Sequence, residues 1–311
     1  MCLVRYAPAI SKKAGALSYE QFLELVDGMP ELRRLTLQGL GEPLLSPHLL
    51  EMVEHTAARG IEVGFNTNGT LLTRPIAERL VEIGCGWLHV SLDGATAATY
   101  EDVRHGTNMR PHPGQFERVV SNLRALVEAR GTAPRPRVQI VFVAMRRNVA
   151  ELPDLVALAA DIGVESVWVQ NLSHDFGDTE PDGAYRAIRE YAAEEALFGL
   201  EPPRAEAVFE RAAARARELG VELRLPALEE PQRGDPRGCS WPWESAYVTH
   251  RGDVQPCCMV MGSDRARMGR LGDAGFDEIW HGPAYRSFRT ALLGDEPPQV
   301  CRGCSLYRRV F

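Results

Sequence analysis

Four cysteines in the last quarter of the chain have the type and spacing of metal ligands. Cys239 is followed by Gly252 and Cys257, and a closing pair, Cys301 and Cys304, is separated by two residues. Four thiolates suit either a tetrahedral structural zinc or a cubane iron–sulfur cluster, and the spacing does not choose between them. Paired thiols at this spacing in a reducing compartment are usually ligands, so we expect a metal centre here.

The chain has seven cysteines, and the other three are read differently. Cys258 stands beside Cys257, and the sequence leaves open which of the two is the ligand. Cys85 precedes an apolar segment and is expected to be a small core residue. Cys2 stands alone at the start of the chain.

A second group of polar residues follows three consecutive apolar segments. Each member occurs in a stretch that also signals a turn, since Asn-Gly and Asp-Gly are common turn pairs. Because the carboxyl ends of parallel strands meet at one edge of a sheet, three such stretches in succession favour a ligand site at that edge. The candidate residues are Glu42, Asn66, Asn68, Ser91 and Asp93.

These residues need an alternation of strands and helices to position them, and the hydrophobic pattern predicts one. Ser18 and Gln21 form an expected capping box at the first helix. Regular alternation of this kind predicts an α/β fold built from right-handed βαβ units on a parallel sheet. The predicted strands span 32–38, 61–67, 87–92, 138–145 and 166–171, and the predicted helices span 18–27, 47–59, 74–83, 115–130 and 149–162.

The first regular element is a helix, whereas a parallel ladder should begin with a strand. We therefore expect a strand before Met1, with Cys2 at the carboxyl end of that strand. This is the edge at which α/β folds bind ligands.

Composition places the chain among ordinary globular proteins. Its 311 residues, 45% hydrophobic and 25% charged, suffice for one large and one small domain. A net charge of −7 and a pI near 5.7 argue against a nucleic-acid surface. No apolar run approaches the roughly 18 residues of a membrane helix, and Arg5, Lys12 and Lys13 follow Met1 without the apolar core expected of a signal peptide. We expect a cytoplasmic protein without nucleic-acid or membrane partners.

The motifs together resemble those of radical S-adenosylmethionine (radical SAM) enzymes with a C-terminal auxiliary iron–sulfur domain of the SPASM or twitch type. The resemblance implies a partial (β/α)6 TIM-like barrel over residues 1–225, its first strand absent, and a small cysteine-rich iron–sulfur domain over 226–311. The motifs that carry it are GLGEP (39–43), NTNGTLL (66–72), VSLDGATAATYEDVRHG (90–106), VQIVFVAMRRN (138–148), and Cys-x12-Gly-x4-Cys with a later CxxC.

The resemblance gives Cys2 a role. In that family three cysteines, spaced C-x3-C-x-φ-C with φ apolar, hold a catalytic [4Fe–4S] cluster on the loop after the first strand. Cys2 matches the third cysteine and Met1 the apolar position. The other two are expected three and seven residues before Cys2, so we expect that this chain is truncated inside the motif. One thiolate does not replace three.

The same resemblance assigns the methionine end of S-adenosylmethionine. Gly41, Glu42 and Pro43 match the segment that meets the methionyl amino group, and Arg104 matches a partner of the cofactor carboxylate. An amino group needs acceptors and a carboxylate suits a guanidinium.

The ribose end of the cofactor is assigned in the same way. Ser91 and Asp93 match the ribose contacts, and Asn66 and Asn68 line the same pocket. Short polar side chains suit a diol, which both donates and accepts hydrogen bonds.

In the tail, Cys239, Cys257, Cys301 and Cys304 match the ligands of a single auxiliary [4Fe–4S] cluster. Four protein thiolates leave no iron open to substrate, which favours an electron relay. The implied activity is reductive cleavage of S-adenosylmethionine to a 5′-deoxyadenosyl radical, followed by substrate oxidation. The implied partners are a small-molecule or peptide substrate and an electron donor such as flavodoxin or ferredoxin.

Two alternatives stay open. The same architecture serves maturases, which modify peptides or proteins. A non-catalytic metal-binding protein, with zinc in the tail and a degenerate barrel, is an alternative of another class. The region 173–238 is also open. A solvated helix is predicted over 204–220, and His174 and Asp175 lie in a predicted loop that is a candidate wall of a substrate pocket.

Overall fold

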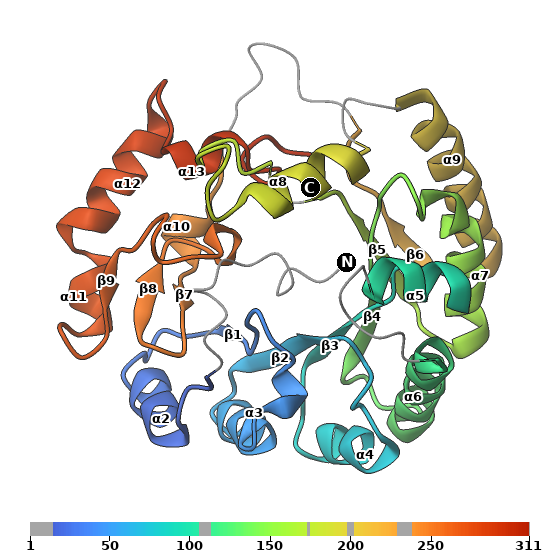
Figure 1. Cartoon of the computed structure of the whole chain (residues 1–311). Helices are drawn as coiled ribbons and strands as arrows, with labels where there is room; N and C mark the ends of the chain where they lie inside the picture. The colour runs from blue at the N-terminus through green and yellow to red at the C-terminus, as the bar shows by residue number, and fades with distance from the viewer. Residues whose placement is uncertain (1–14, 106–112, 173–174, 198–201, 229–237, 311) are drawn as a thin grey trace. The chain divides into compact units, whose positions relative to one another are not determined.

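The computed structural model describes residues 15–105, 113–172, 175–197, 202–228 and 238–310 (Figure 1). This part of the chain forms two compact units. We call them the sheet unit, within 31–171 and 195–228, and the cysteine unit, within 15–30, 172–194 and 238–310. The predicted domain boundary at residue 225 lies close to the end of the sheet unit. Residues 15–30 and 172–194, however, group with the cysteine tail and not with the sheet.

Six parallel strands form the centre of the sheet unit and pair in chain order. In β3 and β4, for example, Leu88 aligns with Val138 and Val90 with Ile140. Because successive crossovers turn the same way, this order curves the sheet toward a barrel, as Figure 1 shows. The strands are β1 (Arg34–Thr36), β2 (Glu62–Thr67), β3 (Trp87–Ser91), β4 (Arg137–Val143), β5 (Ser166–Gln170) and β6 (Glu222–Arg224).

The sequence predicts the first five of these strands, and the structure confirms each with slightly different bounds. The sixth strand, β6, is not predicted. It has three residues and directly follows a long charged helix, and a pattern of that length cannot separate a strand from a continuing helix. The predicted α/β class is confirmed.

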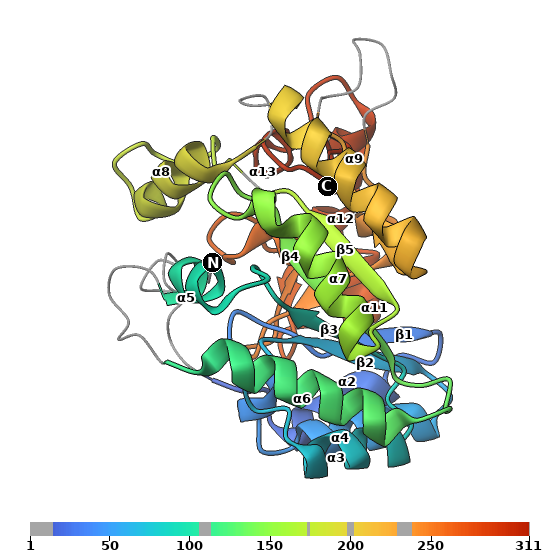
Figure 2. The ribbon, with the colours of Figure 1, turned by 90° about the vertical axis from the view of Figure 1, so that its right-hand side faces the viewer.

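The helices of the sheet unit cover the outer face of the curved sheet (Figure 2). All the predicted helices are confirmed within a few residues, whereas the helix over 97–105 is new. Nowhere in the described ranges is a helix long and apolar enough to cross a membrane. The elements are the 3-10 turns η1 (Pro43–Leu45) and η2 (Val149–Glu151) and the helices α3 (Leu49–Ala58), α4 (Arg74–Glu82), α5 (Ala97–His105), α6 (Gln115–Arg130), α7 (Leu152–Ile162) and α9 (Pro202–Leu219).

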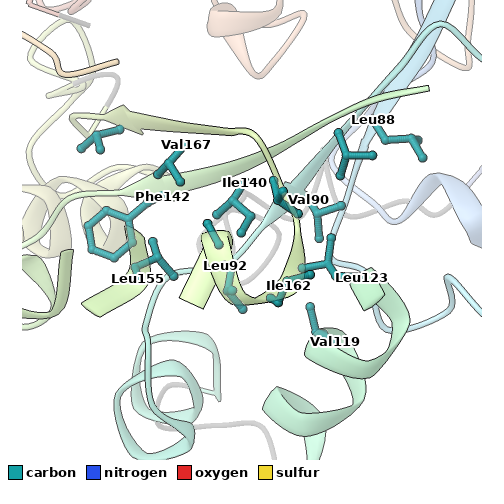
Figure 3. Packing of buried hydrophobic residues seen from close by; sticks show 14 of the residues in the cluster. Leu88, Val90, Leu92, Val119, Leu123, Ile140, Phe142, Leu155, Ile162 and Val167 are labelled. Carbon is teal, nitrogen blue, oxygen red and sulfur yellow. The ribbon is translucent and has the colours of Figure 1, made fainter. Parts of the chain in front are cut away.

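The core of the sheet unit lies between the strands and these helices (Figure 3). Leu88 and Val90 of β3 are fully buried, as are Val119 and Leu123 of α6. Strand side chains alternate between faces, so Trp87, His89 and Ser91 belong to the opposite face. Removing one such buried Leu side chain typically costs about 2–5 kcal/mol, so this packing holds the strand ends in place.

The cysteine unit is built from short elements around a small antiparallel sheet. Val254, Ile279 and Tyr285 form a buried cluster, and the Tyr285 hydroxyl donates to the carbonyl of Gln255 (3.1 Å). Its elements are α2 (Tyr19–Asp27), α8 (Arg186–Glu195, whose last residue belongs to the sheet unit), α10 (Trp241–Glu244), β7 (Tyr247–Val248), β8 (Asp253–Gln255), η3 (Cys258–Val260), β9 (Gly269–Arg270), α11 (Phe276–Trp280), α12 (Pro283–Leu293) and α13 (Gln299–Arg302).

The predicted capping box at the start of α2 is confirmed. The Ser18 hydroxyl accepts from the Gln21 backbone N–H (3.2 Å), and the Gln21 side chain accepts from the Ser18 N–H (3.3 Å). Two donors that the helix leaves unpaired are thus satisfied locally.

Candidate functional site

Glu42 links two loops at the carboxyl edge of the sheet. It follows β1, and its carboxylate accepts from the Thr67 hydroxyl (2.7 Å) and the Asn68 N–H (2.8 Å), both at the end of β2. It also accepts from the Leu44 N–H (3.3 Å) and so caps η1. The predicted meeting of the first two polar stretches at one edge is therefore present, with Glu42 as the residue that joins them.

The two asparagines of the second stretch make separate contacts. Asn66 donates to the side-chain oxygen of Gln38, which extends from the end of the neighbouring strand. The Asn68 side-chain oxygen accepts from the N–H (2.9 Å) and the hydroxyl (2.6 Å) of Thr70, which forms the turn after β2. Asn66 is exposed and Asn68 is half-buried, so Asn66 is the more accessible of the two.

Asp93 and Arg104 form a buried ion pair. The Asp93 side chain is 1% exposed, and its Oδ2 lies 2.7 Å from a terminal nitrogen of Arg104. Its Oδ1 accepts from the Val143 N–H (2.9 Å) at the end of β4. Both carboxylate oxygens therefore contact protein groups, and Arg104 of α5 is held against the loop after β3. Ser91, the last residue of β3, is half-buried beside Val141.

Asn148 is a residue of this edge to which sequence reasoning assigned no role. It is fully buried, and its amide donates to the carbonyls of Asp93 (3.1 Å) and Val143 (2.9 Å) while its oxygen accepts from the Met145 N–H (2.8 Å). It joins the loops after β3 and β4. The available signal was its place at the end of the motif VQIVFVAMRRN.

Glu151 was also missed, and it fixes the start of α5. Its carboxylate accepts from the Ala95 N–H (2.7 Å) and from the hydroxyls of Thr96 (2.9 Å) and Thr99 (2.5 Å). A carboxylate at a helix start satisfies unpaired N–H groups and complements the helix dipole. Gly94 is required here, because a Cβ would lie 2.7 Å from the Tyr100 nitrogen.

In the cysteine unit, the four predicted ligands gather although they come from distant segments. Cys304 is within electrostatic range of Cys239, Cys257 and Cys301. Cys239, Cys301 and Cys304 also belong to one packed cluster with Leu292. In the described ranges, no three His, Cys, Asp or Glu side chains are arranged to hold a single metal ion.

The surroundings of the four sulfur atoms fit an iron–sulfur cluster. Burial, together with the neighbouring thiols, raises the pKa of Cys239 and Cys257, and it raises the pKa of Cys301 to about 12. Backbone groups of Trp241 and Met259 counter this effect by hydrogen bonding to Cys239 and Cys257. Burial favours the neutral form of these thiols, whereas the backbone donors favour the thiolate form. An iron–sulfur cluster has a positively charged core, so it would stabilise the thiolate forms as its ligands.

The remaining cysteines and loop candidates are considered one by one. Cys85 is fully buried and its pKa is raised to about 12 by burial, which confirms the predicted core role. Cys258 is half-buried beside Cys257, and the choice between them stays a prediction. Cys2 and His174 lie outside the described residues. Asp175 is described, and its N–H donates to the carbonyl of Gly303 (3.2 Å), between two predicted ligands.

Two parts of the chain match known families. Residues 1–165 match the radical SAM superfamily. Residues 239–305 match SPASM, an iron–sulfur cluster-binding domain. The first match contains the whole polar edge described above, and the second contains all four gathered cysteines.

Individual relatives show the same similarity. The chain is 29% identical to an AdoMet-dependent heme synthase of Methanosarcina barkeri, over 96% of this chain and 85% of that protein. It is 26% identical to a PqqA peptide cyclase of Xanthomonas campestris pv. campestris, over 85% of this chain and 64% of that protein. The solved structure of anSMEcpe with bound AdoMet superposes with a TM-score of 0.66 over 99% of this chain and 80% of that chain, at 16% identity. The last comparison shows a shared fold and confirms the predicted architecture.

Proposed function

This chain belongs to the radical SAM superfamily, and we propose that it is an enzyme that oxidises its substrate with one auxiliary iron–sulfur cluster as electron relay. When bound, S-adenosylmethionine and a catalytic iron–sulfur cluster supply a radical that removes a hydrogen atom from the substrate. Cys2 is the proposed ligand of the catalytic cluster in this chain.

The observation that carries the proposal is the gathering of four thiols in the cysteine unit, of which Cys304 is buried and the other three are half-buried. Cys239, Cys257, Cys301 and Cys304 provide one thiolate for each iron of a [4Fe–4S] cluster. With every iron bound to protein, such a cluster has no position for substrate. It is therefore suited to accept an electron from a substrate radical, and the net reaction is an oxidation.

Gly41, Glu42 and Pro43 are the proposed contacts of the methionyl amino group. Glu42 fixes this loop against the end of β2, while a Cβ placed on Gly41 would meet no atom of the described residues within 4 Å. The loop thus presents bare backbone to open space, where carbonyl groups can accept from an amino group.

Arg104, Ser91 and Asp93 are the proposed contacts of the carboxylate and ribose. Asp93 holds the Arg104 cation at the edge of the sheet, where a carboxylate can share it. Ser91 supplies a hydroxyl at the end of β3, and we propose that Asn66, in β2, and Asn68, just after it, line the same binding site.

A second candidate function is peptide modification by the same chemistry. It is favoured by the similarity to a PqqA peptide cyclase over 85% of this chain. For both candidates we propose a small-molecule or peptide substrate and a protein electron donor of the flavodoxin or ferredoxin type.

The test begins with a longer chain that adds the two cysteines expected three and seven residues before Cys2. It is purified without oxygen, reconstituted with iron and sulfide, and reduced with dithionite in the presence of S-adenosylmethionine. We expect 5′-deoxyadenosine and methionine in equal amounts by mass spectrometry. Cys2→Ala should abolish both products, whereas Cys85→Ala, which removes a thiol from the core of the sheet unit, serves as a control that retains them. Protein that binds iron but forms no 5′-deoxyadenosine would instead support the non-catalytic metal-binding alternative.

A further experiment separates the two catalytic candidates. A PqqA-type precursor peptide is added to the same reaction, and its mass is followed. A changed mass favours peptide modification. An unchanged peptide leaves substrate oxidation as the better supported candidate.

A further inference from the structure

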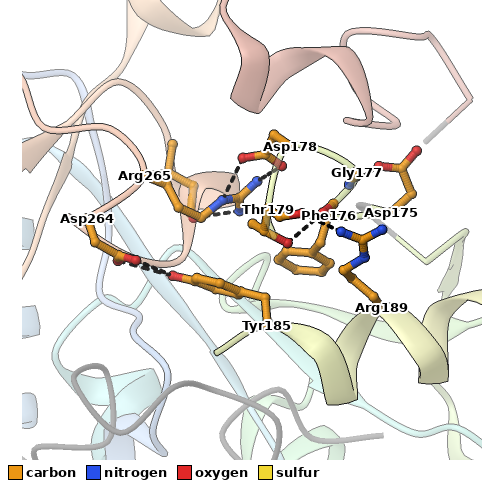
Figure 4. Close-up of polar contacts among 10 residues, drawn as sticks. Asp175, Phe176, Gly177, Asp178, Thr179, Tyr185, Arg189, Asp264 and Arg265 are labelled. Carbon is orange, nitrogen blue, oxygen red and sulfur yellow. Dashed lines mark hydrogen bonds and ion pairs between the residues drawn. The ribbon is translucent and has the colours of Figure 1, made fainter. Parts of the chain in front are cut away.

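Arg265 lies in an enclosed site of the cysteine unit (Figure 4). Its side chain is 4% exposed and that of Asp178 is 8% exposed. Two guanidinium nitrogens donate to Asp178, Nε to Oδ2 (3.0 Å) and Nη2 to Oδ1 (2.6 Å), and Nη1 donates to the carbonyl of Val260 (2.9 Å). A buried charge with three directed contacts is held in one position.

Two aromatic rings lie beside the same guanidinium. Its central carbon lies 4.9 Å from the ring centre of Phe176 and 5.5 Å from that of Tyr185. The two rings stack on one another, and the Tyr185 hydroxyl contacts both carboxylate oxygens of Asp264 (3.1 Å each). The aromatic faces favour a cation here and prevent it from turning away.

The segments that hold Arg265 are also the segments that carry the cysteines. Val260, the acceptor of Nη1, ends the 3-10 turn η3 that follows Cys257. Asp175, three residues before Asp178, contacts Gly303 inside the CxxC pair, and a Cβ on Gly303 would lie 1.7 Å from an Asp175 oxygen. The guanidinium therefore contacts the segment after Cys257 directly, and it is linked to the segment of Cys301 and Cys304 through residues 175–178.

The charge of Arg265 reaches the sulfur atoms. The guanidinium lies within electrostatic range of Cys301 and Cys304, where its positive charge stabilises added negative charge. Asp178, which pairs with the guanidinium, also lies within electrostatic range of Cys301 and acts in the opposite sense.

We propose that Arg265 is a positioning residue that raises the reduction potential of the auxiliary cluster, and that Asp178 holds Arg265 in place while moderating its effect. The inference rests on the proposed function, because it requires that cluster at Cys239, Cys257, Cys301 and Cys304. Neither residue is expected to touch the substrate.

The physical reason is the change of charge on reduction. A [4Fe–4S] cluster gains one negative charge when it takes up one electron, so a nearby cation stabilises the reduced form more than the oxidised form. A guanidinium stays charged at every accessible pH, and burial strengthens its field. Net charge and hydrogen bonding around a cluster are known to set its potential. A higher potential would help the cluster to accept an electron from a substrate radical.

The test is a redox titration of the auxiliary cluster followed by electron paramagnetic resonance. The full chain carries Cys2→Ala, so that only the auxiliary cluster contributes to the signal. We expect Arg265→Gln to shift the midpoint potential to more negative values and Asp178→Asn to shift it to more positive values. Arg265→Lys, which keeps the charge, and Glu180→Gln, which removes an exposed carboxylate from the same segment, should leave it close to that of the parent.

Opposite shifts in the two neutralising variants support the proposal. Shifts of the same sign, or no shift with unchanged iron content, overturn it, since both contacts would then be structural only. If Arg265→Gln holds no cluster, the remaining variants decide: a positive shift in Asp178→Asn with none in Arg265→Lys supports the proposal, and any other pattern overturns it. A chain whose iron content is unaffected by Cys304→Ala has no such cluster, which would overturn the proposed function as well.

Discussion

The polar edge of the sheet unit and the thiols of the cysteine unit differ in what already surrounds them. Asp93 and Glu151 have protein donors at hydrogen-bonding distance, many of them backbone N–H groups of neighbouring loops. The four tail cysteines are buried or half-buried, and Cys304 lies within electrostatic range of the other three. The polar edge is satisfied without a ligand, because Asp93 pairs with Arg104 and Glu151 accepts hydrogen bonds from protein groups. The group of thiols, in contrast, would be stabilised by a cationic cluster, because neutral thiols contribute little stabilising free energy to one another.

The largest expected effect is the loss of the auxiliary cluster in Cys304→Ala. Cys304 interacts with the other three proposed ligands, so its removal leaves one iron without a protein thiolate. Iron content and visible absorbance after reconstitution should fall by the amount that one [4Fe–4S] cluster contributes. Cys85→Ala, which removes a buried thiol from the sheet unit, is the matched control and should leave the iron content unchanged.

Asp93→Ala tests the polar edge of the sheet unit, where we expect a loss of stability even when no ligand is bound. It removes the carboxylate that pairs with Arg104 and accepts from the Val143 N–H. Breaking a buried pair by removing one partner typically costs about 3–5 kcal/mol. The free energy of unfolding, from urea denaturation of the apoprotein, should fall by about this amount.

Asp93→Asn is the conservative control for that variant. It keeps an acceptor for Val143 and loses only the charge, so its loss of stability should be smaller. A loss below about 1 kcal/mol in Asp93→Ala would show that this edge is not complete by itself.

A third effect depends on pH. His89 lies between Trp87 (4.3 Å between ring centres) and Trp168 (5.1 Å), and burial lowers its pKa to about 4. The unfolded chain binds this proton near its ordinary pKa of about 6.5, whereas the folded chain does not bind it until about pH 4. The free energy of unfolding should therefore decrease as the pH falls through this window, by at most about 1.4 kcal/mol per pH unit from this group.

His89→Gln provides the measurement for that effect, because glutamine does not titrate and still offers a hydrogen bond to Gln139. The difference in urea midpoint between the parent and the variant should change between pH 6.5 and pH 4 and stay constant above pH 7. A difference that is constant over the whole range would contradict the assignment to His89.

The smallest expected effect concerns Glu151. Glu151→Ala removes the carboxylate that caps the start of α5, and caps of this kind are worth about 1 kcal/mol. Urea denaturation measures this loss. The control is Glu82→Ala, which removes an exposed partner of Arg79 and should change stability by less than about 0.5 kcal/mol.

Much of the fold was predictable because its signals are local. Five strands and their helices follow from periodic apolar residues, and the Ser18–Gln21 cap follows from two side chains three residues apart. The cysteine ligands were recognisable as a set by type and spacing. The short strand β6 and helix α5 were not predicted, because β6 is too short for a period and α5 begins inside a polar motif.

The sequence by itself determined which segments alternate, which residues stand at strand ends, and which thiols are the predicted ligands. Only the tertiary structure decided the pairings, such as Asp93 with Arg104, Glu42 with the end of β2, and Arg265 with Asp178. The physical reason is range. Secondary structure and turn signals act over a few residues, whereas Arg265 and Asp178 are distant in sequence and meet only after the chain has folded.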